Sequence, residues 1–340
     1  MLYYNLEVLM SNNFLSMTSA LALSAGIAVA DVPKVAVDIA PVHSLVSKVM
    51  NGLGEPKLII PAEASPHEYQ LRPSEAKALQ EAKLVFWIGE DLTPWLEKGL
   101  STLASEATIT ALLEVDGIKL LDFREGALFE AHDHDDHDDH DDHDDHDDHD
   151  KKKEDHDDHD DHDDHEGHGH GEHDPHAWLS PGIAKVWLNV IAAKLSEIDS
   201  ENAGTYFANA DAAKQELDAL SEEVNRVLEP VRGEKYIVFH DAYQYFENHF
   251  NISASGAISL GDASDPSPAR LSEIRKRIND ESIHCVLAEP QYNDGLVKAV
   301  VEGTDSNTAV IDPLGVGLEV GPSLYNKLIK NLGLNLAKCF

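Results

Sequence analysis

The longest helical pattern in the chain lies at residues 201–228, which read ENAGTYFANADAAKQELDALSEEVNRVL. Apolar residues recur along it at intervals of three and four, and they are Ala213, Leu217, Leu220, Val224 and Leu228. This spacing places them on one face of a helix, which Pro230 closes. At about 1.5 Å per residue the helix would be roughly 42 Å long. It is therefore long enough to cross from one lobe of the protein to another.

Strand and helix patterns alternate on both sides of this long helix. Short apolar runs predict strands at 35–39, 57–60, 84–88, 236–239, 285–288 and 309–311. A helical pattern follows the first strand and runs towards Gly54, and others lie at 73–82, 92–103, 181–198, 271–279 and 324–336. Such alternation is typical of parallel sheets that helices cover on both faces. The sequence thus predicts an α/β fold with two similar lobes, each a mainly parallel sheet flanked by helices, joined by one long helix.

The predicted domains follow from this pattern. The N-terminal lobe covers residues 31–200, the linking helix 201–230 and the C-terminal lobe 231–340. Residues 1–30 predict a signal peptide, because an apolar stretch ends there in Ala-Val-Ala, the pattern that signal peptidase cleaves. No Lys or Arg precedes this stretch, which suggests that translation starts at Met10 or Met17. A transmembrane anchor is the alternative, but the stretch is shorter than the roughly 20 apolar residues that a span needs.

A low-complexity segment at residues 132–173 repeats the unit His-Asp-Asp and contains 14 His. It has no apolar residue to bury, so we expect it to be disordered without metal. Residues 132–174 contribute −20 of the formal net charge of −37, which leaves −17 for the rest. An acidic surface of this kind repels phosphate backbones and argues against a nucleic-acid partner. We expect the segment to bind metal ions; an acidic spacer, or weak Ca²⁺ binding by its Asp residues, is the alternative.

Three further histidines lie where strands or loops end. His67 follows the predicted strand at 57–60, His176 precedes the helix at 181–198, and His240 directly follows the strand at 236–239. In parallel α/β sheets, ligands bind outside the carboxyl ends of the strands. A cleft could therefore bring His67 and His240 together from different lobes, and imidazole suits Zn²⁺. The alternative is that each is a structural histidine held by hydrogen bonds.

Five short motifs in these regions resemble those of the ZnuA-type solute-binding proteins, which feed metal ions to ABC importers. They are SPHEYQLRPS at 65–74, DPHAWL at 174–179, FHDAY at 239–243, AEPQ at 288–291 and IDPLG at 311–315. The match runs through essentially the whole mature chain in the family's order. The acidic, His-rich segment before the second motif is also common among zinc-specific members.

The resemblance implies that His67, His176 and His240 bind one ion between the lobes. Manganese-binding relatives carry Glu where this chain has His240, and a third imidazole favours zinc over Mn²⁺. In some relatives a Glu precedes the first histidine, whereas this chain has Pro66 there. The fourth ligand is then Asp312, which matches an acidic position of the family, or water.

We do not expect four other residues, Glu289, His43, His249 and His284, to bind the ion. We expect Glu289 to support a ligand or the fold rather than to bind the ion. His43 lies in a stretch that matches the family but not a metal motif, so we interpret it as structural or cleft-lining. His249 and His284 are expected to be ordinary surface or core residues.

The two cysteines, Cys285 and Cys339, form an even number in an exported chain, which favours a disulfide. The family resemblance supports this bond, because zinc-binding members often carry Cys at both positions.

The predicted function is that of a periplasmic, monomeric zinc-binding protein that is not an enzyme. Its expected partners are the membrane permease of an ABC zinc importer and a periplasmic metallochaperone. A manganese-binding relative, a metal buffer that uses only the His-rich segment, and a zinc hydrolase are the alternatives. The hydrolase is disfavoured because the chain lacks the H-E-x-x-H and G-x-S-x-G motifs and a phosphate loop.

Overall fold

Two four-stranded parallel sheets organise the part of the chain that the structure, a computed structural model, describes. The described residues are 32–124, 129, 173–259 and 266–340. The predicted signal peptide lies outside them, and so does the His-rich segment except for His173, which means that neither prediction is addressed by the fold. We call the first sheet and its helices the N-lobe, and the second sheet and its helices the C-lobe.

The N-lobe sheet has the strand order β2-β1-β3-β4, with every pair parallel. Its strands are β1 (Val35–Val37), β2 (Lys57–Leu58), β3 (Leu84–Trp87) and β4 (Thr108–Ala111), and its helices are α1 (Ala40–Val49), α2 (Pro73–Glu81) and α3 (Pro94–Leu103). All residues of β1 and β3 are buried. Helices on both faces of a parallel sheet explain why these strands are continuous apolar runs rather than alternating ones.

The C-lobe sheet repeats this arrangement with the order β6-β5-β7-β8. Its elements are β5 (Tyr236–His240), α6 (Gln244–Phe250), β6 (Ala257–Ser259), α7 (Pro268–Glu281), β7 (Cys285–Ala288), α8 (Asp294–Val301) and β8 (Asn307–Val310). Alternate residues of β5 face different cores. Ile237 and Phe239 belong to a cluster with α7 and α8, whereas Tyr236 and Val238 belong to the large core that includes the N-lobe.

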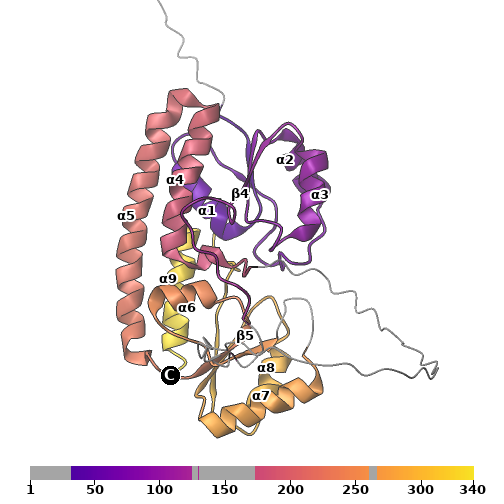
Figure 1. The fold of residues 1–340 in the computed structure, drawn as a ribbon, viewed down its shortest axis with the longest axis vertical. Coiled ribbons are helices and arrows are strands. Elements are labelled where there is room, and N and C mark those ends of the chain that lie inside the picture. Colours follow the sequence, from indigo (N-terminus) through magenta and orange to yellow (C-terminus); the bar gives the residue numbers. More distant parts are fainter. Residues whose placement is uncertain (1–31, 125–128, 130–172, 260–265) are drawn as a thin grey trace, which may run out of the picture. The chain divides into compact units, whose positions relative to one another are not determined.

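A layer of long helices connects the lobes. It contains α4 (Pro181–Ile198), α5 (Ala203–Leu228) and α9 (Leu324–Ala337), and Figure 1 shows α5 running alongside the other two. Asn209 on α5 donates hydrogen bonds to the carbonyls of Val49 and Asn51 at the end of α1, at 2.9 Å each. Further along α5, Ser221 lies 3.2 Å from the ring of His249 on α6 of the C-lobe. The predicted linking helix therefore contacts both lobes.

The last helix, α9, reinforces this connection, because it packs against both α5 and α1. Gly333 permits the close approach: a Cβ atom there would lie 2.8 Å from Cγ1 of Val224 on α5. The backbone N–H of Tyr325 donates to Ser44 Oγ of α1 at 3.0 Å. Two helices rather than one thus link the lobes, which restricts their relative movement.

The predicted fold class is confirmed, and most predicted boundaries agree with the structure within a few residues. The long helix begins at Ala203 rather than Glu201, because Ser200–Asn202 form a short 3-10 turn. Four elements were not predicted from the sequence: β4, α6, β6 and α8. Each is short, and β4 is mostly exposed, so it carries little of the apolar pattern that identifies a strand. Among the described residues, no helix is long and apolar enough to cross a membrane.

A disulfide joins Cys285 to Cys339, as predicted. Cys285 begins β7 and Cys339 follows α9, so the bond fastens the end of α9 to the C-lobe sheet. Next to it, Asn307 Nδ2 of β8 donates to the carbonyl of Cys339 at 2.9 Å.

We expect the double variant Cys285→Ala/Cys339→Ala to lower the free energy of unfolding by about 2–4 kcal/mol, because the unfolded chain would lose a covalent constraint. Reversible denaturant unfolding of the zinc-free protein measures this loss. Two free thiols in the unreduced, denatured wild type would show instead that the bond does not form.

Candidate metal centre

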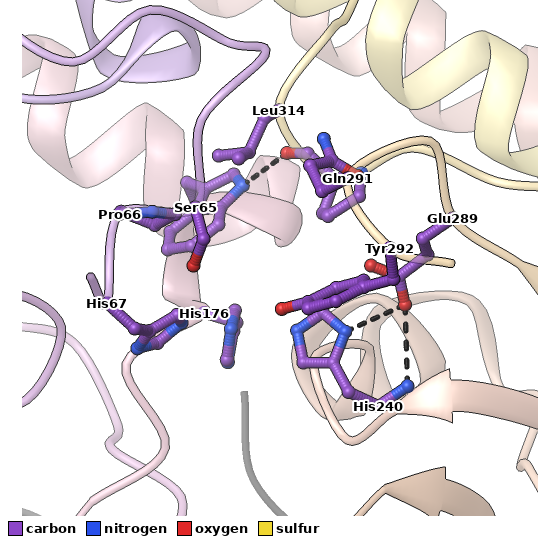
Figure 2. Close-up of a pocket in the computed structure, with 11 residues that line it drawn as sticks. Ser65, Pro66, His67, His176, His240, Glu289, Gln291, Tyr292 and Leu314 are labelled. Atoms are coloured by element: carbon purple, nitrogen blue, oxygen red, sulfur yellow. Dashed lines mark hydrogen bonds and ion pairs between the residues drawn. The ribbon is translucent and has the colours of Figure 1, made fainter. Parts of the chain in front are cut away.

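Three histidines from separate elements meet between the lobes. His67 lies in the loop between β2 and α2, His176 precedes the 3-10 turn Ala177–Leu179, and His240 is the last residue of β5. One ring nitrogen of each lies within 4.8 Å of those of the other two, and Figure 2 shows the three rings directed towards one another. His176 and His240 are buried, while His67 is partly exposed. Among the described residues, this is the one cluster of three or more metal-binding side chains of this kind.

Carboxylates fix the orientation of two of these rings. Asp174 Oδ1 lies 2.8 Å from Nδ1 of His176, and Glu289 Oε1 lies 2.7 Å from Nδ1 of His240. An ionised carboxylate only accepts hydrogen bonds, so each Nδ1 carries the proton and Nε2 is the nitrogen with the lone pair in the neutral ring. Carboxylate–histidine pairs of this kind orient metal ligands and raise their basicity. His176 and His240 are thus arranged to bind a cation through Nε2.

Two tyrosines pack against the His240 ring. Tyr243 lies edge-on to it, with ring centroids 6.3 Å apart, and burial and the charge of Glu289 raise the pKa of its phenol. Tyr292 packs edge-on against the His240 ring, with ring centroids 5.4 Å apart, and its phenol extends towards the three histidines in Figure 2.

The cavity at this centre is small. Its volume is about 10 Å³, and its lining comes from both lobes, including His67, His176 and Trp178 on one side and His240, Glu289 and Tyr292 on the other. Pockets for organic molecules usually have volumes of roughly 300–1,000 Å³. This one matches a single ion or water molecule, since about 10–15 Å³ accommodates one water.

Asp312 does not join the three histidines in the structure. Its Oδ1 accepts hydrogen bonds from Gln291 Nε2 at 2.9 Å and from the Leu314 N–H at 3.0 Å, and its Oδ2 accepts one from the Val316 N–H. The carboxylate thus stabilises the turn after β8, next to the cavity-lining residues Pro313 and Leu314. The structure therefore does not identify the fourth ligand of the ion, and Asp312 or water stays a prediction.

Three other described histidines do not belong to this cluster and make their contacts elsewhere. His43 is buried, with Nε2 3.1 Å from the Pro56 carbonyl and Nδ1 3.3 Å from Ser47 Oγ. His249 lies between Ser180 and Ser221, while His284 is largely exposed near Glu234. Burial lowers the pKa of both His43 and His249.

A group of buried charges lies beside the centre. Arg124 Nη1 donates to Glu247 at 2.7 Å, and Nε donates to Asp241, the residue after His240, at 3.0 Å. Burial raises the pKa of both carboxyl groups, and Arg124 opposes this rise. Sequence reasoning did not identify Arg124, because a single Arg among acidic residues matches no motif. It also assigned no role to Asp174, although the spacing Asp-Pro-His at 174–176 is the sort of local signal that could have indicated one.

A family model matches residues 35–339, and its description is ZnuA, the periplasmic component A of the zinc-uptake complex. Similar characterised proteins carry the name high-affinity zinc uptake system protein ZnuA. The one from Brucella abortus (strain 2308) is 50% identical over 305 residues, covering 90% of this chain and 91% of its own length. The one from Paracoccus denitrificans (strain Pd 1222) is 47% identical over 326 residues, covering 96% and 97%.

Solved structures share the fold. A crystal structure of ZnuA superimposes with a TM-score of 0.70 at 21% identity, covering 91% of this chain and 99% of its own. FpvC from Pseudomonas aeruginosa, solved in complex with Mn²⁺, gives a TM-score of 0.71 at 17% identity and covers 91% and 98%. At this level of identity the similarity establishes the architecture alone.

We expect the zinc-free protein to lose stability as the pH falls below 6.5, partly because of His249. Its folded-state pKa lies below the unfolded value of 6.5, so the unfolded state takes up the proton first and gains stability relative to the folded one. Denaturant unfolding at pH 7.5, 6.0 and 5.0 should show a smaller loss for His249→Gln than for wild type. His284→Gln, which changes an exposed ring, is the matched control and should follow the wild type. If the free energy of unfolding depends on pH equally in wild type and His249→Gln, His249 does not contribute to the loss of stability in acid.

Proposed function

Because the chain belongs to the ZnuA family of periplasmic zinc-uptake components, we propose that it captures Zn²⁺ between its lobes and delivers the ion to the membrane permease of an ABC-type importer. The observation that carries the proposal is the convergence of His67, His176 and His240 within 4.8 Å. Three imidazoles suit Zn²⁺, which is bound at about 2.0–2.1 Å by histidine nitrogen. Hard Mn²⁺ prefers oxygen ligands, so this donor set argues against the manganese alternative.

The fourth position of the ion is best served by water. Asp312, the other candidate, would have to give up hydrogen bonds to Gln291 and to two backbone N–H groups before it could bind metal. A water ligand would leave with the ion and would require no rearrangement of the loop after β8.

We further propose that the protein has no catalytic activity. A catalytic zinc site with three histidines and a water would share this donor set. The volume of about 10 Å³, however, leaves no room beside the ion for an organic substrate. The signal peptide at residues 1–30, the monomeric state and a metallochaperone as a second partner belong to the same proposal.

The segment at 132–173 is proposed to bind further Zn²⁺ ions more weakly than the histidine centre. A flexible chain loses about 1–2 kcal/mol of backbone entropy for each residue that becomes ordered around an ion. The folded centre has already met most of this cost. On this view the segment collects metal, and it is not the tight site.

Deleting residues 132–173 should leave one tight Zn²⁺ site, which the triple variant His67→Ala/His176→Ala/His240→Ala should abolish. Free Zn²⁺ at 100 times the Kd should raise the free energy of unfolding by about 2.7 kcal/mol. Chelator competition measures the affinity, and His284→Ala in the same background is the control for loss of an exposed histidine.

Two outcomes would contradict the proposal. If the triple variant binds zinc as tightly as its parent, the site lies elsewhere. If the deletion alone abolishes tight binding, the segment is the binding site and the protein is a metal buffer.

The carboxylates behind the ligands give a second prediction. Asp174→Asn and Glu289→Gln should each weaken zinc binding by about 10-fold or more, because each removes the charge that orients an imidazole and raises its basicity. Asp122→Asn is the control, since Asp122 is exposed and pairs with His173 rather than with a ligand. Affinities of both buried variants within twofold of the wild type would show that the carboxylates serve the fold alone.

A further inference from the structure

The positively charged side chain of Arg124 lies between the two lobes, next to the proposed zinc ligands. Arg124 belongs to the connection that follows β4 of the N-lobe and runs towards β5 of the C-lobe (Figure 1). Its guanidinium meets Asp241, after the end of β5, and Glu247 on α6. The side chains of Arg124, Asp241 and Glu247 are 18%, 11% and 5% exposed, so water hardly screens the contact.

The geometry is that of a fork. Nε contacts both oxygens of Asp241 at 3.0 Å, Nη2 also contacts Asp241, and Nη1 donates to Glu247 at 2.7 Å. The ring of Phe129 covers the guanidinium at 3.7 Å from its centroid. Arginine suits such a site because its planar donors are fixed in position and always charged. Separating these partners would leave two carboxylates buried without a counter-charge, which is strongly unfavourable.

Neutral hydrogen bonds fasten the same connection to the C-lobe. The Leu121 N–H donates to Tyr245 Oη at 3.0 Å, and Gln244 Nε2 donates to the Asp122 carbonyl at 3.0 Å. Gln244 Nε2 also reaches Asp174 Oδ2 at 3.2 Å, and Asp174 is the carboxylate that orients His176. The contacts around Arg124 therefore extend to two of the three proposed ligands. They reach His240 through its neighbour Asp241, and His176 through Gln244 and Asp174.

We propose that Arg124 is a positioning residue that latches the two lobes together and thereby sets how long Zn²⁺ stays in the centre. The inference rests on the proposed function, namely that His67 and His176 share one ion with His240. Release requires the His240 side of the centre to separate from the other two rings. The same movement pulls Asp241 and Glu247 away from Arg124, so the latch adds to the barrier for release.

The test is the rate at which Zn²⁺ leaves the full chain loaded with one equivalent of the metal. Stopped-flow mixing with an excess of a chromogenic chelator gives both a rate and an amplitude. We expect Arg124→Gln to release Zn²⁺ about 10-fold faster or more, since loss of one member of a buried charge cluster acts mainly on dissociation. Arg124→Lys, which keeps the charge but not the fork, should release at an intermediate rate.

If Arg124 only stabilised the fold, its replacement would change the amplitude of release and not the rate. Damage to the fold lowers the amplitude, which counts competent protein, and leaves the rate of the remaining fraction unchanged. Arg226→Gln removes an exposed ion pair on α5 and should match the wild type in both. If Arg124→Gln does not fold, Tyr245→Phe removes only the phenol oxygen that accepts the Leu121 N–H, a neutral bond of the same contact, and should speed release roughly threefold.

The result that would overturn the latch is release from the folded Arg124→Gln or Tyr245→Phe variant within experimental error of the wild-type rate. The triple histidine variant separates this failure from failure of the proposed function. If wild type and triple variant release Zn²⁺ with the same trace, the ion does not occupy the histidine centre at all. If they differ while the latch variants match the wild type, the latch alone is wrong.

Discussion

A zinc ion accepts about four donors at close to 2 Å, and here the three imidazoles come from separate elements of the two lobes. The fold meets this constraint by directing the carboxyl ends of both parallel sheets towards one point. His240 ends β5, and His67 lies in the loop that follows β2. His176 enters between them just before α4, so its position depends on the helical layer that the lobes share. Any change that separates the lobes would therefore dismantle the site before it unfolded either sheet.

The ligand rings are held by residues that are in turn held by others further from the site. Asp174 and Glu289 orient the rings, Gln244 holds Asp174, and Arg124 joins the carboxylates next to His240 to the opposite lobe. Helices α5 and α9 then hold the lobes at a larger scale, with α9 fixed to the C-lobe sheet by a disulfide. Because hydrogen-bonded carboxylates hold two of the ligand rings in the folded protein, we expect little of the binding energy to be spent on ordering the chain. We also expect release to require modest shifts in the latch region rather than a wide hinge movement.

The residues that could be predicted from the sequence are those whose identity is tied to a repeating pattern or a local motif. The stripe of α5 and the apolar runs of β1, β3, β5 and β7 revealed two lobes and a link. The three histidines were identified because each lies at an element boundary within a short motif. Asp312 shares such a motif, but its carboxylate is engaged by backbone N–H groups of the turn it precedes, which no linear pattern reveals. Arg124 and Gln244 act through contacts with residues more than 60 positions away, so only the folded chain identifies them.

We propose above all that one Zn²⁺ ion is bound by His67 and by the Nε2 atoms of His176 and His240. Anomalous diffraction at the zinc absorption edge, from crystals of the protein grown with one equivalent of the metal, locates the ion directly. We expect one strong peak among the three rings, at about 2.0–2.1 Å from Nε2 of His176, from Nε2 of His240 and from a ring nitrogen of His67. A peak that lies elsewhere, or that is bound through Nδ1 of His176 or His240 with the carboxylates displaced, would contradict it.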